Sequence, residues 1–218
     1  MAFDPESRLV VSVVPGKRTT ETAVALVTDF KRRTGDRLMN LITTDGYPAY
    51  EEVILNAYGE TVTPPRTGRP GRPKAPYKVP PPGLNYAMVE KTREKGRVVK
   101  IATRVVFGTI LAVTAALRMS SVSTAINTSF VERENGTDRH RNARKARKTY
   151  RFSKEWSYHE AVTYLTMYVY NFCWPVRTLE TMGEEGRRQR RSSAMAAGLA
   201  DHVWSIAEWI TFPTVQHC

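Results

Sequence analysis

The stretch Leu38-Met-Asn-Leu-Ile-Thr-Thr-Asp45-Gly-Tyr-Pro48-Ala-Tyr50 contains the junction that decides the fold. Its first half is rich in apolar and β-branched residues over the length of a strand, and the Asp-Gly pair is typical of turns. Pro48 suits the first turn of a helix, because a proline there loses no intrahelical hydrogen bond. Apolar residues then recur with helical spacing as far as a stop at Gly59. The stretch therefore predicts a strand followed by a helix.

The same order of elements precedes this junction. Leu9–Val14 is a β-branched run of strand length that is closed by a Pro-Gly pair. Thr19 or Thr20 can cap a helix that continues with apolar residues at helical spacing and ends at Gly35. Strand, helix, strand and helix at this spacing favour a sheet with crossover helices, so the predicted fold class is α/β.

The composition changes sharply at Pro64–Pro82, which holds eight prolines and five basic residues but no acidic residue. Because proline fixes φ and has no amide donor, we predict an extended basic insertion rather than a packed helix or an inner strand. Beyond it, the pattern predicts a strand at Arg97–Phe107 and helices over 111–117, 129–148, 158–173 and 207–210. The apolar stripe expected on the third of these helices is Val162, Leu165, Val169 and Phe172.

Basic residues outnumber acidic ones by 33 to 21, so the formal net charge is +12. Since 41% of the residues are hydrophobic, a disordered polycation is excluded, and we expect a folded domain that binds a polyanion. No apolar run reaches the roughly 18 residues of a membrane span, and no signal-peptide pattern is found. Two cysteines and four scattered histidines disfavour a disulfide scaffold or a zinc site and favour an intracellular protein.

Three acidic residues attract attention by their positions. Asp45 follows a predicted strand at the edge where open α/β sheets place their sites, and Asp4 lies just before a strand. Both aspartates also suit ordinary turns, where this residue is common. Glu132 follows Ser129 by three residues, as in a capping box. Position and spacing leave a catalytic and a purely local role open for all three.

Five segments combine into a more specific pattern: Ala2-Phe-Asp-Pro-Glu-Ser-Arg8, Thr43-Thr-Asp-Gly-Tyr-Pro-Ala-Tyr50, Thr128-Ser-Phe-Val-Glu-Arg-Glu-Asn135 continuing to Arg147-Lys-Thr-Tyr-Arg-Phe-Ser-Lys154, Tyr170-Asn-Phe-Cys173 and Ala194-Met-Ala-Ala-Gly198. In this order they resemble the three acidic motifs and the tail of bacterial insertion-sequence transposases of the DDE type, which are integrase-like. The likeness covers essentially the whole chain.

The resemblance implies a ribonuclease-H-like mixed sheet flanked by helices, with the Pro/Arg-rich insertion and a helical C-terminal extension. It implies that Asp4, Asp45 and Glu132 are catalytic and ligate two Mg²⁺ (or Mn²⁺) ions. Such a group makes physical sense, because three adjacent carboxylates repel one another unless a cation is present. Two ions can stabilise the attacking and leaving oxygens of a displacement at phosphorus. The implied activity is metal-dependent cleavage of phosphodiesters and strand transfer in DNA transposition and recombination.

The basic segment that follows Glu132 fits a DNA partner. We expect Asn135 and Arg139, which lie three and seven residues after Glu132, to position the scissile phosphate. The flanking DNA backbone would be held by Arg133, Arg141, Arg144, Lys145, Arg147 and Lys148. A merely solvated charged face is the alternative. In the insertion, Arg69 and Arg72 resemble a minor-groove hook, although a plain basic loop explains them as well.

By this resemblance, residues 1–62 begin the catalytic domain, 63–96 form the insertion, 97–174 complete the domain with the Glu-bearing helix, and 175–218 form a C-terminal extension. Only three residues precede Asp4, so the N-terminal DNA-recognition module of the family is expected to be absent. Two hypotheses follow: an active catalytic domain, or a truncated and inactive DNA-binding remnant. A homo-oligomer that pairs two DNA ends, in the cytoplasm of a bacterium and associated with its nucleoid, is expected.

Overall fold

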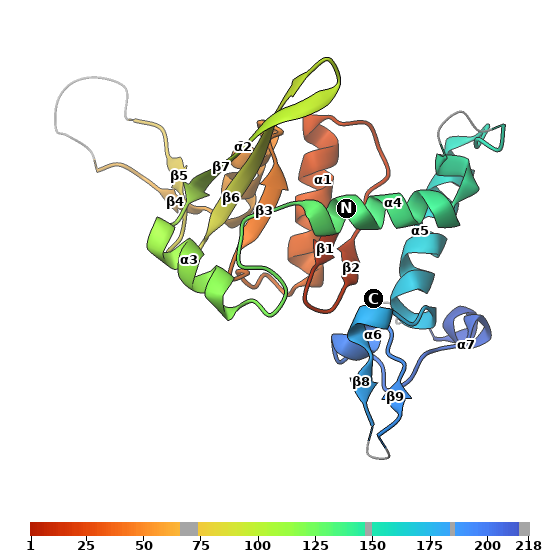
Figure 1. Cartoon of the computed structure of the whole chain (residues 1–218). Coiled ribbons are helices and arrows are strands. Elements are labelled where there is room, and N and C mark those ends of the chain that lie inside the picture. Colours follow the sequence, from red (N-terminus) through yellow and green to blue (C-terminus); the bar gives the residue numbers. More distant parts are fainter. Residues whose placement is uncertain (66–73, 147–149, 184–185, 214–218) are drawn as a thin grey trace. The chain divides into compact units, whose positions relative to one another are not determined.

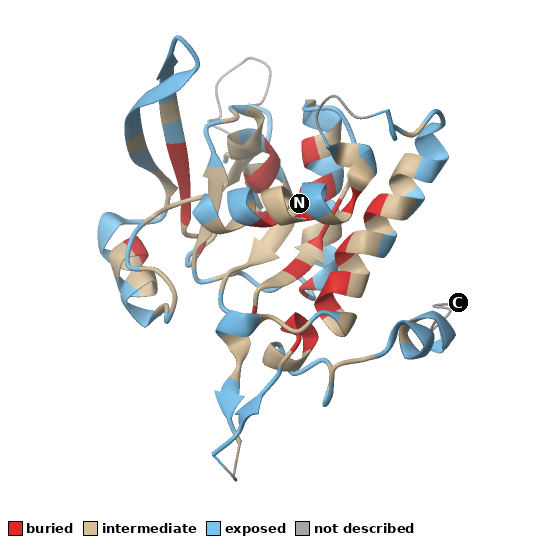
Figure 2. Ribbon diagram, turned by 45° about the vertical axis from the view of Figure 1, so that its right-hand side comes forward, coloured by how far each residue is buried: buried red, intermediate tan, exposed pale blue. Residues whose placement is uncertain are grey.

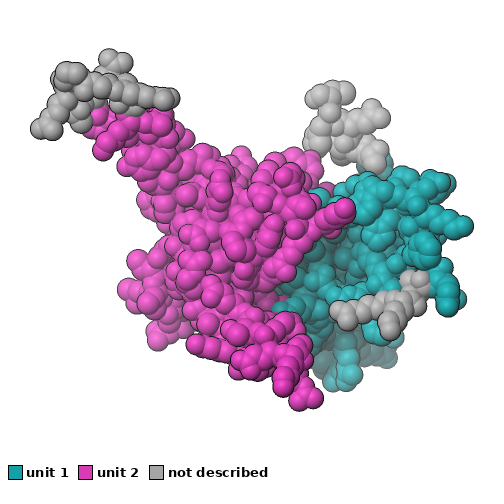
Figure 3. Space-filling view, turned by 90° about the horizontal axis from the view of Figure 1, so that it is seen from above, with its two compact units in different colours: residues 1–15, 129–218 teal, residues 16–128 magenta. Residues whose placement is uncertain are grey.

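The computed structural model describes residues 1–65, 74–146, 150–183 and 186–213. Its architecture is mixed α/β, which confirms the fold class predicted from the sequence at this level (Figure 1). The chain divides into two compact units: unit 1 contains residues 1–15 and 129–218, and unit 2 contains residues 16–128 (Figure 3). Within the described ranges, no helix is long and apolar enough to cross a membrane.

Unit 2 is built around a three-stranded sheet in the order β3-β6-β7. β3 (Ile42–Asp45) runs parallel to β6 (Tyr86–Glu94), which is antiparallel to β7 (Arg97–Phe107). α1 (Thr20–Arg33) precedes β3, and α2 (Ala49–Tyr58) lies in the crossover that two parallel strands require. Its core is formed by apolar side chains of both helices, of the first half of β6 and of Leu84 just before that strand: Ala23, Val27, Val53, Ile54, Tyr58, Leu84, Tyr86 and Met88.

The ends of α1 and α2 follow the local signals of the sequence. The Thr19 side chain accepts a hydrogen bond from the amide of Thr22 at 3.4 Å and caps α1, and Gly35 adopts a φ of +60° beyond its end. α2 ends at Gly59, whose amide donates to the Leu55 carbonyl at 2.7 Å. A Cβ at Gly59 would lie 2.3 Å from that carbonyl oxygen, so a glycine is required there. These boundaries agree with the sequence prediction.

A two-stranded sheet pairs β4 (Glu60–Val62) with β5 (Tyr77–Val79). β5 belongs to the stretch that was predicted to be extended and basic. As one strand of a two-stranded sheet it lies at a sheet edge, and edge strands are where a proline-rich segment can pair. The division that places residues 63–96 in an insertion differs from the structure, because β6 lies in that range and is the middle strand of the main sheet. β7 has the predicted bounds, and α3 (Ile110–Met119) includes the helix predicted after it.

Unit 1 combines the N-terminal hairpin with the helices that follow residue 128. β1 (Ala2–Asp4) pairs antiparallel with β2 (Leu9–Ser12). α4 (Ser129–Arg141) ends earlier than the predicted 148 and is followed by a short 3-10 turn, η1 (Ala143–Lys145). α5 (Trp156–Cys173) packs against β2 and against α4. Residues from both ends of the chain therefore form one unit.

α5 and β2 contact each other through apolar side chains and through the polar side chain of Asn171. Val10 and Val13 pack with Met167 and Tyr170 to form the core of unit 1. The side-chain amide of Asn171 accepts a hydrogen bond from the Val10 amide at 2.9 Å and donates to the Val10 carbonyl at 2.8 Å. Asn171 thus satisfies backbone groups of β2 as a neighbouring strand would.

The buried face of α5 differs from the predicted one. The buried residues are Thr163, Met167, Tyr170 and Asn171, whereas the expected stripe was Val162, Leu165, Val169 and Phe172. Leu165 is 44% exposed. The stripe prediction is wrong because apolarity was used as the only criterion, whereas the helix buries two polar residues whose hydrogen bonds are satisfied within the unit.

The C-terminal part of unit 1 consists of short elements. η2 (Arg177–Leu179) precedes a small hairpin of β8 (Thr181–Met182) and β9 (Arg188–Gln189). α6 (Ser193–Ala196) and α7 (Ile206–Thr211) follow. α7 begins with the capping box predicted from the sequence, in which Ser205 accepts from the Glu208 amide at 3.1 Å and Glu208 accepts from the Ser205 amide at 2.6 Å.

Candidate functional site

Asp4 is held in a tight turn between β1 and β2. One carboxylate oxygen accepts a hydrogen bond from the Glu6 amide at 3.1 Å. The other accepts from the Ser7 amide at 3.2 Å and from the Ser7 hydroxyl. The turn role that the sequence left open for Asp4 is therefore present. A carboxylate has about four lone-pair sites, so these three bonds do not exhaust its capacity to bind a cation.

The helix that carries Glu132 packs against the strand that carries Asp4. α4 and β1 are in contact within unit 1, although they are far apart in the sequence. At the start of α4 the guanidinium carbon of Arg8 lies 4.6 Å from the centre of the Phe130 ring. The Arg8 carbonyl accepts a hydrogen bond from the Ser193 hydroxyl at 2.9 Å. Glu132 itself is exposed near the N-terminal end of α4.

The opposite side of α4 holds two buried acidic residues that the sequence analysis missed. Glu134 and Asp138 are 6% and 5% exposed. Lys145 lies 2.6 Å from the Asp138 carboxylate, and Arg141 lies 3.8 Å from the Glu134 carboxylate. Burial raises the pKa of Glu134 to about 7, against the opposing effect of Arg141. In both pairs the cation follows the acid by seven residues, which is a signal that could have been found.

Arg141 is fixed further by two aromatic rings. Its guanidinium carbon lies 4.5 Å from the centre of the Tyr170 ring and 4.3 Å from the centre of the Trp174 ring. Burial lowers the pKa of Arg141 from its ordinary value. Two of the residues expected to hold DNA, Arg141 and Lys145, therefore use their charge inside unit 1. Arg133, Arg139 and Arg144 are exposed, and Asn135 is half-buried.

The end of α4 and the segment after it line a hollow of about 450 Å³. Among the residues that the structure describes, its lining includes three arginines, Arg141, Arg144 and Arg151, together with Phe152, and no acidic side chain. Asn142 also lines this hollow and is 3% exposed; its Nδ2 is buried and has no hydrogen-bond partner within the described ranges. A cationic lining beside an unused amide donor suits an anion such as a phosphate.

Asp45 ends β3 in unit 2, opposite Val89 of β6. Its side chain is 52% exposed and lies 2.9 Å from the guanidinium of Arg18. Arg18 also lies over the ring of Tyr47, with its guanidinium carbon 4.8 Å from the ring centre. An ion pair this exposed contributes about 1 kcal/mol or less, so another cation can compete with Arg18 for the carboxylate.

Two further carboxylates lie near this edge of the sheet and were not expected from the sequence. The Arg104 guanidinium is 2.9 Å from Glu51 and 3.5 Å from Glu90. A Cβ at Gly46 would lie 3.2 Å from the Glu90 side chain, so the turn after Asp45 closely approaches that residue. Arginine side chains balance the acidic groups of unit 2 at this edge.

The three predicted catalytic residues are thus divided between the units. Asp4 and Glu132 belong to unit 1 and Asp45 belongs to unit 2. In the part of the chain that the structure describes, no group of three or more His, Cys, Asp and Glu side chains is arranged to hold a metal ion. The donor chemistry nevertheless fits, since carboxylate oxygens are what Mg²⁺ prefers. Arg69, Arg72, Arg147 and Lys148 lie outside the described residues.

Comparisons of the chain with protein-family models, with curated proteins and with solved structures find no match.

Proposed function

We propose that this chain is the catalytic domain of a DDE-type transposase that binds DNA and cleaves and joins phosphodiesters with divalent metal ions. The observation that carries the proposal is the contact between β1, which bears Asp4, and α4, which bears Glu132. Asp45 supports it by ending a strand that is parallel to its neighbour β6. A ribonuclease-H-like catalytic domain draws its acids from two strands and a helix, and Asp4, Asp45 and Glu132 lie on elements of these kinds.

Asp4, Asp45 and Glu132 would hold the metal, which when bound supplies electrostatic stabilisation of the oxygens at the reacting phosphorus. The protein's own part is to orient the DNA. Arg133, Arg139 and Arg144 are exposed on or after α4 and can bind the backbone, while the arginine-lined hollow beside Asn142 suits one phosphate. Because Arg141 and Lys145 already pair with buried acids, we expect them to shape this surface more than to neutralise DNA.

The test is a nicking assay on supercoiled plasmid with Mg²⁺ or Mn²⁺. We expect the wild-type protein to nick the plasmid and Asp45→Asn and Glu132→Gln to abolish nicking, because each removes a charged ligand. Glu52→Gln and Glu155→Gln are the matched controls, since both remove an exposed carboxylate from the same two units. Nicking that survives Asp45→Asn and Glu132→Gln, or that never occurs, contradicts the proposal.

A second candidate is a DNA-binding protein without turnover. It is favoured by the interactions that two of the acids already make. Asp4 accepts hydrogen bonds from amides of its own turn, and Asp45 forms an ion pair with Arg18. Under this function the protein shifts DNA in a binding assay whether or not metal is present, and no nicking is observed. In that case Asp45→Asn leaves DNA affinity unchanged or raises it, because a negative charge is lost.

A further inference from the structure

The hairpin of β6 and β7 extends beyond the sheet to which it belongs. β3 pairs with β6 only as far as Val89, so among the described residues the following part of the hairpin consists of two strands alone (Figure 1). We name residues 90–102 the β6–β7 arm. All of them are exposed except Lys91 and Ala102, which are half-buried, whereas Tyr86–Val89 are buried (Figure 2). The arm is therefore accessible from both faces.

The arm has a defined conformation. Lys95 and Gly96 have φ values of +47° and +80°, as the two central residues of a type I′ hairpin turn do. The strands pair in register from Glu90 opposite Ala102 to Thr92 opposite Lys100, and after a bulge Arg93 lies opposite Val98. Free two-stranded hairpins are marginally stable in water. Anchoring to the buried part of β6 compensates for this, so the arm is a preformed two-stranded ribbon.

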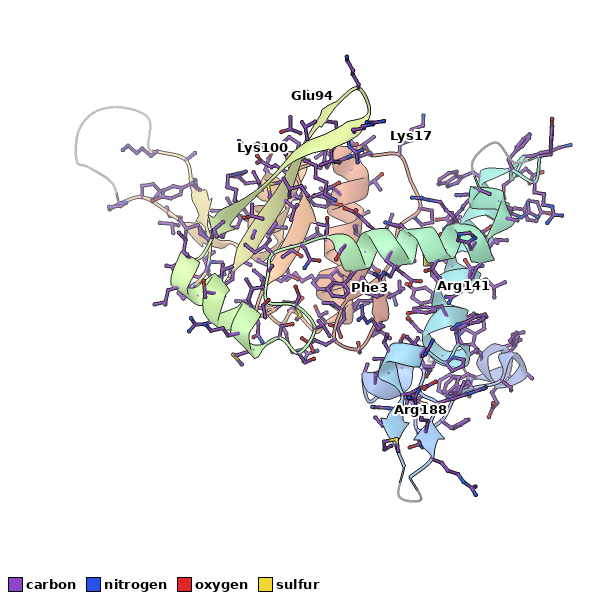
Figure 4. The ribbon with its side chains drawn as sticks, viewed as in Figure 1. Phe3, Lys17, Glu94, Lys100, Arg141 and Arg188 are labelled. Carbon is purple, nitrogen blue, oxygen red and sulfur yellow. The ribbon has the colours of Figure 1, made fainter. Side chains whose placement is uncertain are left out.

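The two faces of the arm differ in chemistry. Directly paired residues of antiparallel strands project to the same face. One face thus contains Lys91 with Ile101 and Arg93 with Val98, and it includes no acid. Ile101 and Val98 are 63% and 41% exposed there, and the bulge residue Val99 is 53% exposed. On the other face Thr92 lies opposite Lys100 and Glu94 lies opposite Arg97. Glu94 and Lys100 can be followed in Figure 4.

The charge of the arm indicates what kind of partner would cover it. Its five basic residues, Lys91, Arg93, Lys95, Arg97 and Lys100, outnumber its acidic residues, Glu90 and Glu94. Two such ribbons would repel each other, so pairing of β7 with a second copy of the chain is disfavoured. A polyanion is complementary to the arm. The major groove of duplex DNA is about 12 Å wide and admits a two-stranded β-ribbon, and thymine methyl groups provide apolar contacts there.

We propose that the β6–β7 arm inserts into the major groove of double-stranded DNA. Val98 and Ile101 face the bases, while the long side chains of the arm's cations, which come from both faces, extend past the strand edges to phosphates at the two rims of the groove. The proposal rests on the proposed function in that DNA is the substrate. It adds a DNA contact in unit 2 that does not use α4, and it gives a reason for exposed apolar residues on a basic hairpin.

The experiment measures fluorescence anisotropy of a labelled 30-base-pair duplex in EDTA, so that binding is separated from cleavage. Arg93→Gln/Lys100→Gln is compared with Lys17→Gln/Arg118→Gln, which removes the same charge from other exposed positions of unit 2. We expect the arm variant to bind about tenfold more weakly and the slope of log affinity against log salt to become shallower by about 2. The control should stay within about twofold of the wild type.

A second variant tests the apolar face. Val98→Thr/Ile101→Thr keeps β-branched residues at exposed positions, so the hairpin remains folded. We expect about threefold to tenfold weaker binding with an unchanged salt slope, because apolar base contacts but no phosphate contacts are lost. If this variant instead converts a dimer to a monomer in analytical ultracentrifugation with DNA affinity unchanged, the arm is a contact between copies and the proposal is overturned.

Other outcomes also decide. Equal weakening by the arm and control variants would mean that only net charge matters, and tighter binding of single strands or of an RNA duplex would name another partner; each overturns the proposal. The nicking assay separates this inference from the proposed function. If the protein binds DNA through the arm but never nicks it, the inference about the arm stands and the proposed catalysis is contradicted. If the protein nicks DNA, and its arm variant binds and nicks as well as the control variant does, the proposed catalysis stands and the inference about the arm is contradicted.

Discussion

Glu134 lies in an environment that a glutamate usually avoids. It lies buried on α4 next to a second buried acid, Asp138. Desolvation of the carboxylate dominates, so its pKa rises to about 7, and Arg141 at 3.8 Å offsets the desolvation only in part. Such a group is neutral near pH 6 and becomes charged just above neutrality. The consequence is a stability that depends on pH.

The sign of this dependence follows from the pKa of Glu134 in the two states. In the unfolded chain it has its ordinary value of 4.5, whereas folding raises it to about 7. Between these values the folded protein retains a proton that the unfolded chain releases, so the free energy of unfolding falls as the pH rises and becomes level above pH 7. From 1.36 kcal/mol per pKa unit, the loss is at most about 3 kcal/mol.

We therefore expect Glu134→Gln to resemble the wild type at pH 5 and to be more stable at pH 8. Urea unfolding of the full chain at both pH values measures this difference. Glu155→Gln, which removes an exposed acid of the same unit, is the control and should change stability by less than about 0.5 kcal/mol at either pH. Parallel pH profiles of the wild type and Glu134→Gln would contradict the expectation.

The candidate catalytic acids show how far local sequence reasoning reaches. The sequence made Asp4 and Asp45 each compatible with a turn or with catalysis, and Asp4 does accept hydrogen bonds within its turn. The partners of Asp45 and Glu90, Arg18 and Arg104, could not be predicted, because they come from different elements. Which cation meets which acid depends on packing and not on sequence spacing.

At the scale of elements, α5 shows that an apolar stripe is an incomplete guide. Met167 is 3% exposed in the core with Val10, whereas Leu165 is 44% exposed on the other side of the helix. We expect Met167→Ala to lower the free energy of unfolding by about 2–5 kcal/mol. Leu165→Ala should lower the free energy of unfolding by less than about 1 kcal/mol, because leucine and alanine are both good helix formers and little buried area is lost. If urea unfolding gave similar losses of stability for the two variants, the face of α5 predicted from the sequence would be the buried one after all.

Elements with local signals were the predictable ones. Thr19 before α1 and Gly59 after α2 act on their own backbone, so their sequence meaning does not depend on the rest of the chain. β6 has no such signal. Its buried first half and exposed second half follow from pairing with β3 over four residues and with β7 along its whole length, which are contacts distant in sequence. The sheet edge at Asp45 was therefore predicted, but the strand beside it was not.

At the scale of the whole molecule, chain order and folding units do not coincide. Unit 1 is assembled from residues 1–15 and 129–218, and unit 2 is continuous over 16–128. A division made along the sequence places 1–62 together, whereas the structure separates the N-terminal hairpin from the helix that follows it. The reason is the partner of β2: the Val10 backbone is satisfied by Asn171 rather than by a strand of unit 2.

This organisation predicts which fragments fold. The core of unit 2 comes entirely from within residues 16–128, so that fragment should unfold cooperatively and show dispersed amide NMR signals on its own. Residues 129–218 lack Val10 and Val13, and Asn171 loses the backbone it bonds, so this fragment should be poorly folded.

Adding a peptide of residues 1–15 should restore cooperative unfolding by supplying β1 and β2. The control peptide carries Val10→Asp, which places a charge at a position that is 1% exposed and should give no restoration. Independent folding of 129–218, or equal rescue by both peptides, would show that the hairpin is not part of its core.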